Sequence, residues 1–311
     1  MGAAAAPALG ARAADYPSRP VELIVGFAAG GPTDIVGRLV AQWLSQHIGQ
    51  QVIIENKSGA GSNLGTEHVV HAVPDGYTLL LVTHANAFNT NLYDGLSFNF
   101  LRDITPIAGI MRVPDVMEVS PDLPVRTVPE FVTYAKANPG KINMATGGVG
   151  SAAQVYGELF KTMTGIDLVP VHYRGTGPAL ADLLAGRVQV LFDPIVSSIE
   201  YIRAGKVRAL AVTSAARSRV LPDLPPVAEF VPGFEASAFY GIGAPKNTPA
   251  QIVDLLNAKM NAGLSDPAFK ARLADLGGNV MPGSPADFGA MMAGETEKWG
   301  RVIRTANIKS E

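Results

Sequence analysis

The sequence contains no cysteine among its 311 residues. This absence excludes disulfide bonds, thiolate catalysis and metal sites built from cysteine, and it suits an oxidising compartment without identifying one. An excess of one charge is also missing, because 25 Lys and Arg against 27 Asp and Glu give a formal net charge of −2. Charge therefore offers no argument for a nucleic acid or an anionic membrane as partner. A small, enclosed ligand fits better.

The first 15 residues are rich in alanine and end in Ala11 to Ala14 before Asp15. They are similar to the small-residue end of a secretory signal whose basic and apolar regions are missing. We therefore expect residues 1–15 to be a disordered remnant of a signal region. An ordinary alanine-rich tail of a cytoplasmic protein is the alternative. No other stretch is long and apolar enough to span a bilayer.

Two glycine-rich turns stand out, and each leads from an apolar strand into an amphipathic helix. They are GFAAGGPTD, Gly26 to Asp34, and TGGVGSAAQ, Thr146 to Gln154. Such a turn places free backbone N–H groups and the positive end of a helix dipole at one point, which favours an anion such as a carboxylate. Two of them, about 120 residues apart, suggest one anion held between two lobes.

Strand and helix patterns alternate along the chain, which predicts an α/β fold with parallel strands and crossover helices. The length and the 47% hydrophobic content support two lobes. We predict a discontinuous first lobe, residues 16–118 plus 236–311, and an inserted second lobe, residues 119–235. The extended segment Thr105 to Ser120 and the proline-rich stretch Leu221 to Pro232 would cross between the lobes and act as a hinge. His84 to Phe100, rich in asparagine and aromatic residues, is expected to be a loop.

Enzymatic and cofactor alternatives have weak support in the motifs. Ser151 could be a nucleophile, but a G-x-S-x-G elbow needs glycine where Ala153 stands, whereas Ser151 and Gln154 have capping-box spacing. Neither turn matches a Walker A or dinucleotide motif. His68 and His71 are three residues apart and lack the H-E-x-x-H order of a zinc site. We predict no catalytic residue, no metal and no cofactor.

The order of motifs resembles the Bug family, the extracytoplasmic solute receptors of tripartite tricarboxylate transporters. The similarity extends over essentially the whole chain after Tyr16. It is carried by PSRPVELIVGFAAGGPTDIVGR, VIIENKSGAGSNLGTEHV, DGYTLLLVT, TGGVGSAAQ, YRGTGPALADLLAGRVQVLFD, GKVRALAVTS and PPVAEFVPGFEA. The resemblance implies a type II periplasmic binding protein fold, in which two lobes with mostly parallel sheets are joined by two crossing segments.

The resemblance also implies a ligand site. One carboxylate would be held by backbone amides of the first glycine loop, and another part of the ligand by the second loop and by neighbouring strand ends. The implied residues are Phe27, Ala28, Ala29, Gly30, Thr83, His84, Gly148, Val149, Gly150, Ser151, Arg174, Gly175, Thr176 and Asp193. Many relatives have Pro-Phe where this chain has Gly26-Phe27, so the pose of Phe27 is open.

Three of these side chains keep an alternative interpretation. His84 could hydrogen-bond the ligand or be a solvated loop histidine. Arg174 could clamp a carboxylate in two-point contact, although an exposed arginine at a lobe edge is common. Asp193 could orient a polar group of the ligand or a water, or could simply belong to a turn or helix cap.

The predicted function is a periplasmic solute receptor, monomeric and not an enzyme. It would capture a small organic carboxylate, whether dicarboxylate, tricarboxylate or aromatic acid, and deliver it to the membrane permease of a tripartite tricarboxylate transporter. A ligand-sensing receptor for a signalling partner is the alternative, and a hydrolase using the same cleft is a weaker one. The sequence leaves the particular acid open.

Overall fold

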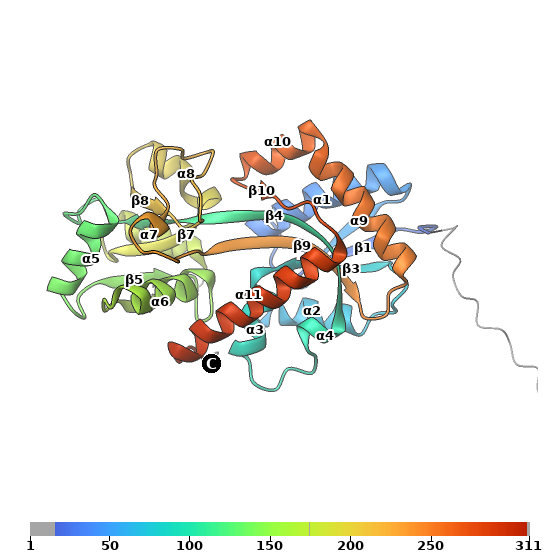
Figure 1. The fold of residues 1–311 in the computed structure, drawn as a ribbon, viewed down its shortest axis with the longest axis horizontal. Helices are drawn as coiled ribbons and strands as arrows, with labels where there is room; N and C mark the ends of the chain where they lie inside the picture. Colours follow the sequence, from blue (N-terminus) through green and yellow to red (C-terminus); the bar gives the residue numbers. More distant parts are fainter. Residues whose placement is uncertain (1–15, 174, 310–311) are drawn as a thin grey trace, which may run out of the picture.

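The computed structural model describes residues 16–173 and 175–309. The expectations for residues 1–15 and for Arg174 lie outside the described residues. The chain forms a mixed α/β fold of two lobes, and the long strand β4, Ile104–Val119, runs through both of them (Figure 1). The strand β9, Ser237–Pro245, pairs with the first-lobe half of β4.

The first lobe has the strand order β2-β1-β3-β9-β4. The bounds are Val21–Val25 for β1, Val52–Asn56 for β2 and Thr78–Thr83 for β3. β1 is parallel to β2 and β3, whereas β9 is antiparallel to β3 and β4. The short strand β10, Asn279–Val280, pairs antiparallel with β4. The predicted parallel strands are therefore present, with antiparallel pairs in the middle of the sheet.

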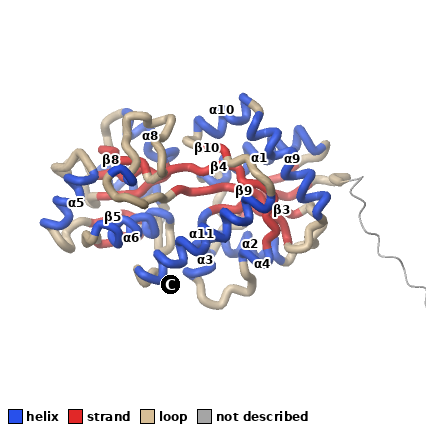
Figure 2. The backbone as a smooth tube through the Cα atoms, viewed as in Figure 1, coloured by secondary structure: helices blue, strands red, loops and turns tan. Residues whose placement is uncertain are grey.

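Helices cover both faces of this sheet, because alternate side chains of a strand point to opposite faces. In β1, Leu23 packs in the cluster that contains residues of α1, α9 and α10, and Ile24 packs in the cluster that contains residues of α2, α3 and α11. The helices of this lobe are α1, Pro32–Ile48; α2, Asn63–Val70; α3, His84–Leu92; α4, Phe100–Asp103; α9, Ala250–Ser265; α10, Pro267–Asp275; and α11, Pro285–Thr305. Figure 2 shows this helical coat around the central strands.

The second lobe is built on the far half of β4. There β4 pairs antiparallel with β7 and β8, and β5 is parallel to β6 and β7. The strands are β5, Asn143–Thr146; β6, Val169–His172; β7, Val190–Pro194; and β8, Arg208–Val212. The helices are α5, Val128–Ala137; α6, Ala152–Thr164; α7, Thr176–Leu184; and α8, Ile195–Arg203.

The two lobes share β4, which changes partners in its middle. Its residues up to Pro114 pair with β9, and those from Asp115 onward pair with β7 and β8. The return crossing lies just before β9, where the N–H of Ala236 donates to the carbonyl of Thr213 at 2.9 Å. The predicted extended segment from Thr105 is thus confirmed. The predicted lobe boundaries at 118/119 and 235/236 stay a prediction.

The expectation of a loop from His84 to Phe100 was wrong, because α3 occupies most of this segment. The N–H of Thr83 donates to Oδ1 of Asn86 at 2.8 Å, which caps the helix start. Asparagine is a weak helix former, but tertiary bonds hold these asparagines. Asn86 Nδ2 donates to Thr66 Oγ1 at 2.8 Å, and Asn89 Nδ2 donates to the carbonyl of Gly61 at 2.6 Å.

Helix α11 runs from the first lobe toward the second (Figure 1). Its residue Trp299 is fully buried against Phe88 of α3 and Tyr156 of α6, with ring centroids 5.3 and 5.0 Å away. The C-terminal helix therefore packs on both lobes. Within the described ranges, no helix has the length and apolar character needed to cross a membrane.

Candidate ligand-binding site

The sequence-predicted residues lie where strands end and helices begin. β1, β3, β5, β6 and β7 each lead into a helix, namely α1, α3, α6, α7 and α8. In α/β sheets, ligands bind in the crevice outside the carboxyl ends of the strands. Ends from the two lobes face each other, because Pro32 of α1 and Pro194 of β7 line the same hollow. The assignment of the predicted residues to a ligand site between the lobes stays a prediction.

The first glycine loop is held from within by Asp34. The N–H of Gly30 donates to Asp34 Oδ2 at 2.9 Å, and Asn56 Nδ2 donates to Asp34 Oδ1 at 2.9 Å. Arg38 adds an ion pair at 2.8 Å. Burial by itself raises the pKa of Asp34, but the hydrogen bonds from Arg38, Gly30 and Asn56 outweigh it and hold the pKa below its ordinary value of 3.8. Asp34 lies in the first turn of α1.

This arrangement shows which amides of the first loop remain available. The N–H of Gly30 donates to Asp34, so in this structure it forms a hydrogen bond within the loop and does not point to a ligand. Ala28 and Ala29 are exposed, whereas Phe27 is half-buried against the core. The carbonyl of Phe27 accepts from Asn56 Nδ2 at 3.0 Å, which anchors the loop entry.

The unusual Gly26 before Phe27 has a steric reason. A Cβ at position 26 would collide with Oγ and Cβ of Ser62. Ser62 is itself fully buried, has a positive φ of 83° and precedes α2. Its Oγ has no hydrogen-bond partner, and neither has Nδ2 of the adjacent Asn63. Ser62 and Asn63 therefore add two unsatisfied polar groups beside the first loop.

The second glycine loop is closed in a similar way by Gln154. The N–H of Gly150 donates to Gln154 Oε1 at 2.7 Å. Ser151 is the N-cap of α6, with its Oγ accepting from the N–H of Gln154 at 3.4 Å, so the predicted cap is confirmed. The capping box is not reciprocal, because the Gln154 side chain serves Gly150 and the N–H of Ser151 donates to the carbonyl of Gly148 at 3.2 Å.

The second loop lies against two other predicted segments. The N–H of Gly175 donates to the carbonyl of Gly147 at 3.1 Å, and Thr176 Cγ2 would lie 3.4 Å from a Cβ on Gly147. Across the lobes, a Cβ on Gly150 would lie 2.7 Å from Cδ1 of Leu92 in α3. The structure thus brings the loops at 147–151 and 175–176 together and places the former against the first lobe.

Thr83 and His84 stand at the start of α3. Thr83 is buried and acts as the N-cap. The ring of His84 packs edge-on against Phe88, and its Nδ1 is buried without a partner. Burial lowers the pKa of His84 to about 4, although the charge of Glu295 acts in the opposite direction. The imidazole is therefore neutral near pH 7 and offers one donor and one acceptor.

Asp193, the last predicted residue, is fully buried at the end of β7, and the hydroxyl of Ser198 is the hydrogen-bonding group that acts on its carboxyl. Two further acids, Asp115 and Glu118 of β4, are also fully buried, and Ser198 acts on Glu118 in the same way. Burial, the main cause, raises the pKa of Asp193 to about 8. It also raises the pKa values of Asp115 and Glu118 well above their ordinary range, and the charge of Asp193 raises both further.

The sequence argument missed Asp115 and Glu118, although one signal was present. Glu118 interrupts the apolar run Val116 to Val119. Burying a charged side chain in such a strand is costly, so charged residues are rare there. Ser198 of α8 was also missed. It is fully buried, and its hydroxyl favours the charged forms of Asp193 and Glu118.

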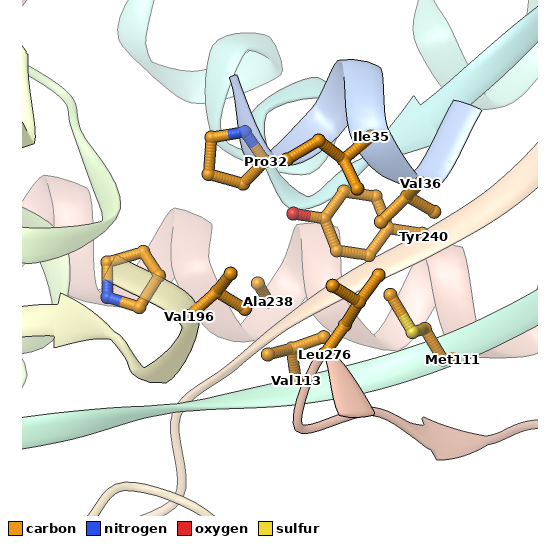
Figure 3. Close-up of a pocket in the computed structure, with 10 residues that line it drawn as sticks. Pro32, Ile35, Val36, Met111, Val113, Val196, Ala238, Tyr240 and Leu276 are labelled. Atoms are coloured by element: carbon orange, nitrogen blue, oxygen red, sulfur yellow. The ribbon is translucent and has the colours of Figure 1, made fainter. Parts of the chain in front are cut away.

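A small hollow lies between the lobes (Figure 3). Tyr240 of β9 points its hydroxyl into it, between Pro32 and Val196. Burial, followed by the charge of Asp115, raises the pKa of Tyr240 to about 12, while a hydrogen bond with Thr33 opposes this rise. The hollow is lined by Pro32, Ile35, Val36, Met111, Val113, Pro194, Val196, Ala238, Tyr240 and Leu276.

Two lobes on the shared strand β4, with a glycine loop before a helix in each lobe, make the architecture of a type II periplasmic binding protein. Solved structures support this class. Rpa4515 of R. palustris, determined with adipate, has a TM-score of 0.86 and 37% identity over 95% of this chain and 99% of that one. The periplasmic binding protein BugD has a TM-score of 0.82 and 36% identity over 95% and 100%. MatC of Rhodopseudomonas palustris, with bound malate, has a TM-score of 0.81 and 33% identity over 93% and 100%.

The family model described as "Tripartite tricarboxylate transporter family receptor" matches residues 36–308. BugT of Bordetella pertussis is 34% identical over 94% of this chain and 91% of its own length. A UPF0065 protein of Agrobacterium vitis is 38% identical over 94% and 85%. The chain belongs to the tripartite tricarboxylate transporter receptor family, and the resemblance to Bug proteins is confirmed.

Proposed function

We propose that this protein is a periplasmic receptor that captures a small organic carboxylate between its lobes and passes it to the permease of a tripartite tricarboxylate transporter. It would act as a monomer and carry out no chemistry on its ligand. The observation that carries this proposal is the pair of glycine loops, one at the start of α1 and one at the start of α6, on opposite lobes. The adipate and malate bound to related proteins are carboxylates and agree with it.

Backbone amides would supply the binding energy. Exposed Ala28 and Ala29 precede the N-terminus of α1, where the helix dipole favours an anion. Gly148, Val149 and the cap Ser151 stand at the corresponding place in the second lobe. Neutral donors in a closed cleft bind a carboxylate without a buried countercharge. The remaining predicted contacts, Thr83, His84, Gly175, Thr176, Asp193 and Arg174, would surround the rest of the ligand.

The direct test is calorimetric titration of the protein with a panel of aliphatic and aromatic carboxylates. We expect at least one to bind with a dissociation constant in the micromolar range or below. No heat and no thermal shift from any acid, with the fold intact by circular dichroism, would contradict the proposal. Uptake of the bound acid should also be lost when the receptor gene is deleted. Intact uptake together with a lost transcriptional response would indicate a sensor instead.

A matched pair of variants tests the first loop. Ala29→Asp places a negative charge beside the proposed carboxylate and should weaken binding at least about tenfold. Ala268→Asp places the same charge on an exposed residue in the first turn of α10 and should leave binding unchanged. Equal affinities for the two variants would remove the first loop from the site.

A further inference from the structure

Trp299 of α11 packs against two helices that belong to opposite lobes and that begin at predicted ligand contacts. Its ring centroid lies 5.3 Å from that of Phe88 in α3 and 5.0 Å from that of Tyr156 in α6. Phe88 is four residues after His84, and Tyr156 is five residues after Ser151. The indole is fully buried. Trp299 is therefore packed against both helices within about two helical turns of the proposed site.

The orientation of this indole is fixed by the buried carboxylate of Glu295. Nε1 of Trp299 donates to Glu295 Oε2 at 2.6 Å, and Nη2 of Arg112 donates to Glu295 Oε1 at 2.7 Å. Hydrogen bonds to a carboxylate are charge-assisted and stronger than those between neutral groups. Because the indole N–H is the one donor of a tryptophan side chain, this bond determines which way the ring lies.

The same face of α11 holds both segments that cross between the lobes. Arg112 lies in β4, shortly before this strand changes partners. Nζ of Lys298 donates to the carbonyl of Glu235 at 2.6 Å, and Glu235 stands just before β9. Lys298 and Trp299 follow Glu295 by three and four residues, so the three side chains are neighbours on the helix surface. Trp299 is thus anchored to the hinge as well as to the two lobes.

The position of Tyr156 depends on packing. Its hydroxyl is buried and has no hydrogen-bond partner among the residues that the structure describes, although a buried tyrosine hydroxyl usually has one. Its ring is held against those of Phe88, at a centroid distance of 6.2 Å, and Trp299. Protein interiors are close-packed and have low compressibility. A change in the size or orientation of the indole must therefore move α6 relative to α3.

We propose that Trp299, oriented by Glu295, is a positioning residue that sets the spacing of α3 and α6 and thereby the length of acid that the receptor accepts. His84 is the first residue of α3, and α6 follows the second glycine loop. An acid that contacts both helix starts must match the distance between them. Trp299 need not touch the acid. This inference rests on the proposed function and deepens it, because it assigns ligand length to residues behind the site.

The first test compares adipate, the acid bound to the related Rpa4515, with the shorter succinate by calorimetry. In Trp299→Phe the smaller ring lets α3 and α6 approach each other, so the shorter acid should gain. We expect the ratio of adipate affinity to succinate affinity to fall about fivefold or more.

Two substitutions at nearby acids of α11 form a matched pair. Glu295→Gln keeps the size of the side chain but loses the charge that orients the indole and binds Arg112, so it should lower the affinity ratio about threefold. Glu297→Gln removes the same charge from an exposed residue two positions along the helix, where Glu297 pairs only with Arg301. It should leave the ratio unchanged.

A second measurement needs no ligand. Because the chain contains no cysteine, Asp94→Cys, just after α3, and Met163→Cys, on α6, would carry one spin label in each lobe. Both positions are exposed. Pulsed electron spin resonance should give a shifted mean label distance in Trp299→Phe and a broader distribution in Glu295→Gln. The control Glu297→Gln should reproduce the wild-type distribution.

Wild-type label distances in the folded variants Trp299→Phe and Glu295→Gln overturn the inference, and so does an unchanged affinity ratio. The proposed function survives either result as long as an acid binds. If Trp299→Phe does not fold, Glu295→Gln alone decides. If neither adipate nor succinate binds the wild type, the label distances decide. If no carboxylate of any kind binds, the proposed function fails, and the assignment of ligand length fails with it.

Discussion

In the first glycine loop the N–H of Gly30 is donated to the carboxylate of Asp34, whereas in the second loop the N–H of Gly150 is donated to the side-chain amide of Gln154. Both acceptors stand four residues after the glycine, in the first turn of the helix that follows. The first acceptor is charged and also binds Arg38 and Asn56. The second acceptor is neutral, and its own N–H donates to Oγ of Ser151, the N-cap of the same helix.

The difference shows that one loop geometry can be held by two kinds of chemistry. A carboxylate at a helix start gains from the helix dipole but repels an anionic ligand, unless Arg38 offsets its charge. A neutral amide interacts less favourably with the helix dipole than a carboxylate does, but it does not repel an anionic ligand. The first-lobe wall contains Asp34 and His84, whose pKa values are shifted, whereas the second loop is closed by the neutral side chain of Gln154.

The largest expected effect is the loss of folding stability at low pH that follows from protonation of His84. Its pKa is about 4 in the folded protein against an ordinary 6.5, so the unfolded state binds more protons between these values. The stability contributed by the neutral ring is fully present above pH 6.5 and is lost as the pH falls toward 4, by about 3 kcal/mol. Urea unfolding from pH 7 to pH 4 should show a steeper loss for wild type than for His84→Gln. Parallel curves would show that His84 does not titrate in this range.

Asp34→Asn should cost about 2 kcal/mol at pH 7, because the new amide cannot accept from Gly30, Asn56 and Arg38 at once. Equilibrium urea unfolding measures this loss. Since the pKa of Asp34 is lowered, its contribution is present above the ordinary value of 3.8 and disappears as the pH falls through the lower folded value. A cost below about 0.5 kcal/mol would mean that the loop does not depend on the charge.

Gly26→Ala should cost about 1.5 kcal/mol by overpacking against Ser62. The double variant Gly26→Ala with Ser62→Gly should recover most of this loss, because it removes the clashing side chain and suits the positive φ at position 62. Unfolding of the two single variants and the double variant gives the coupling energy. Additive losses would show that the two residues do not compete for one space.

Gln154→Glu should have the smallest effect on stability, within about 0.5 kcal/mol, because a glutamate still accepts from Gly150 and favours the helix N-terminus. It makes the second loop resemble the first, but without an arginine to offset the charge. We expect carboxylate affinity to fall about fivefold, measured by titration with whichever acid the wild type binds. An unchanged affinity would place the carboxylate away from this loop.

Much of the fold was predictable because strong local signals agree with the tertiary structure. β3, Thr78–Thr83, is a short, nearly continuous apolar run, and α5, Val128–Ala137, places buried Val128, Phe131 and Ala135 at helical spacing. Helix α3 was missed because its asparagines favour loops locally and are held by Thr66 and Gly61, at least 20 residues away in sequence. The Ser151 cap was predictable because its partner Gln154 is three residues away.

The amino-acid sequence alone determined the family, the two glycine loops and most strands and helices, because these depend on local composition and on neighbours close in the chain. Only the tertiary structure decided that Ser62 fills the space beside Gly26, that Asn56 anchors the first glycine loop, and that Asp115, Glu118 and Asp193 are buried without an ion pair to any described residue. Such contacts join segments distant in sequence, and burial, which raises the pKa of the acids, exists only once those segments pack.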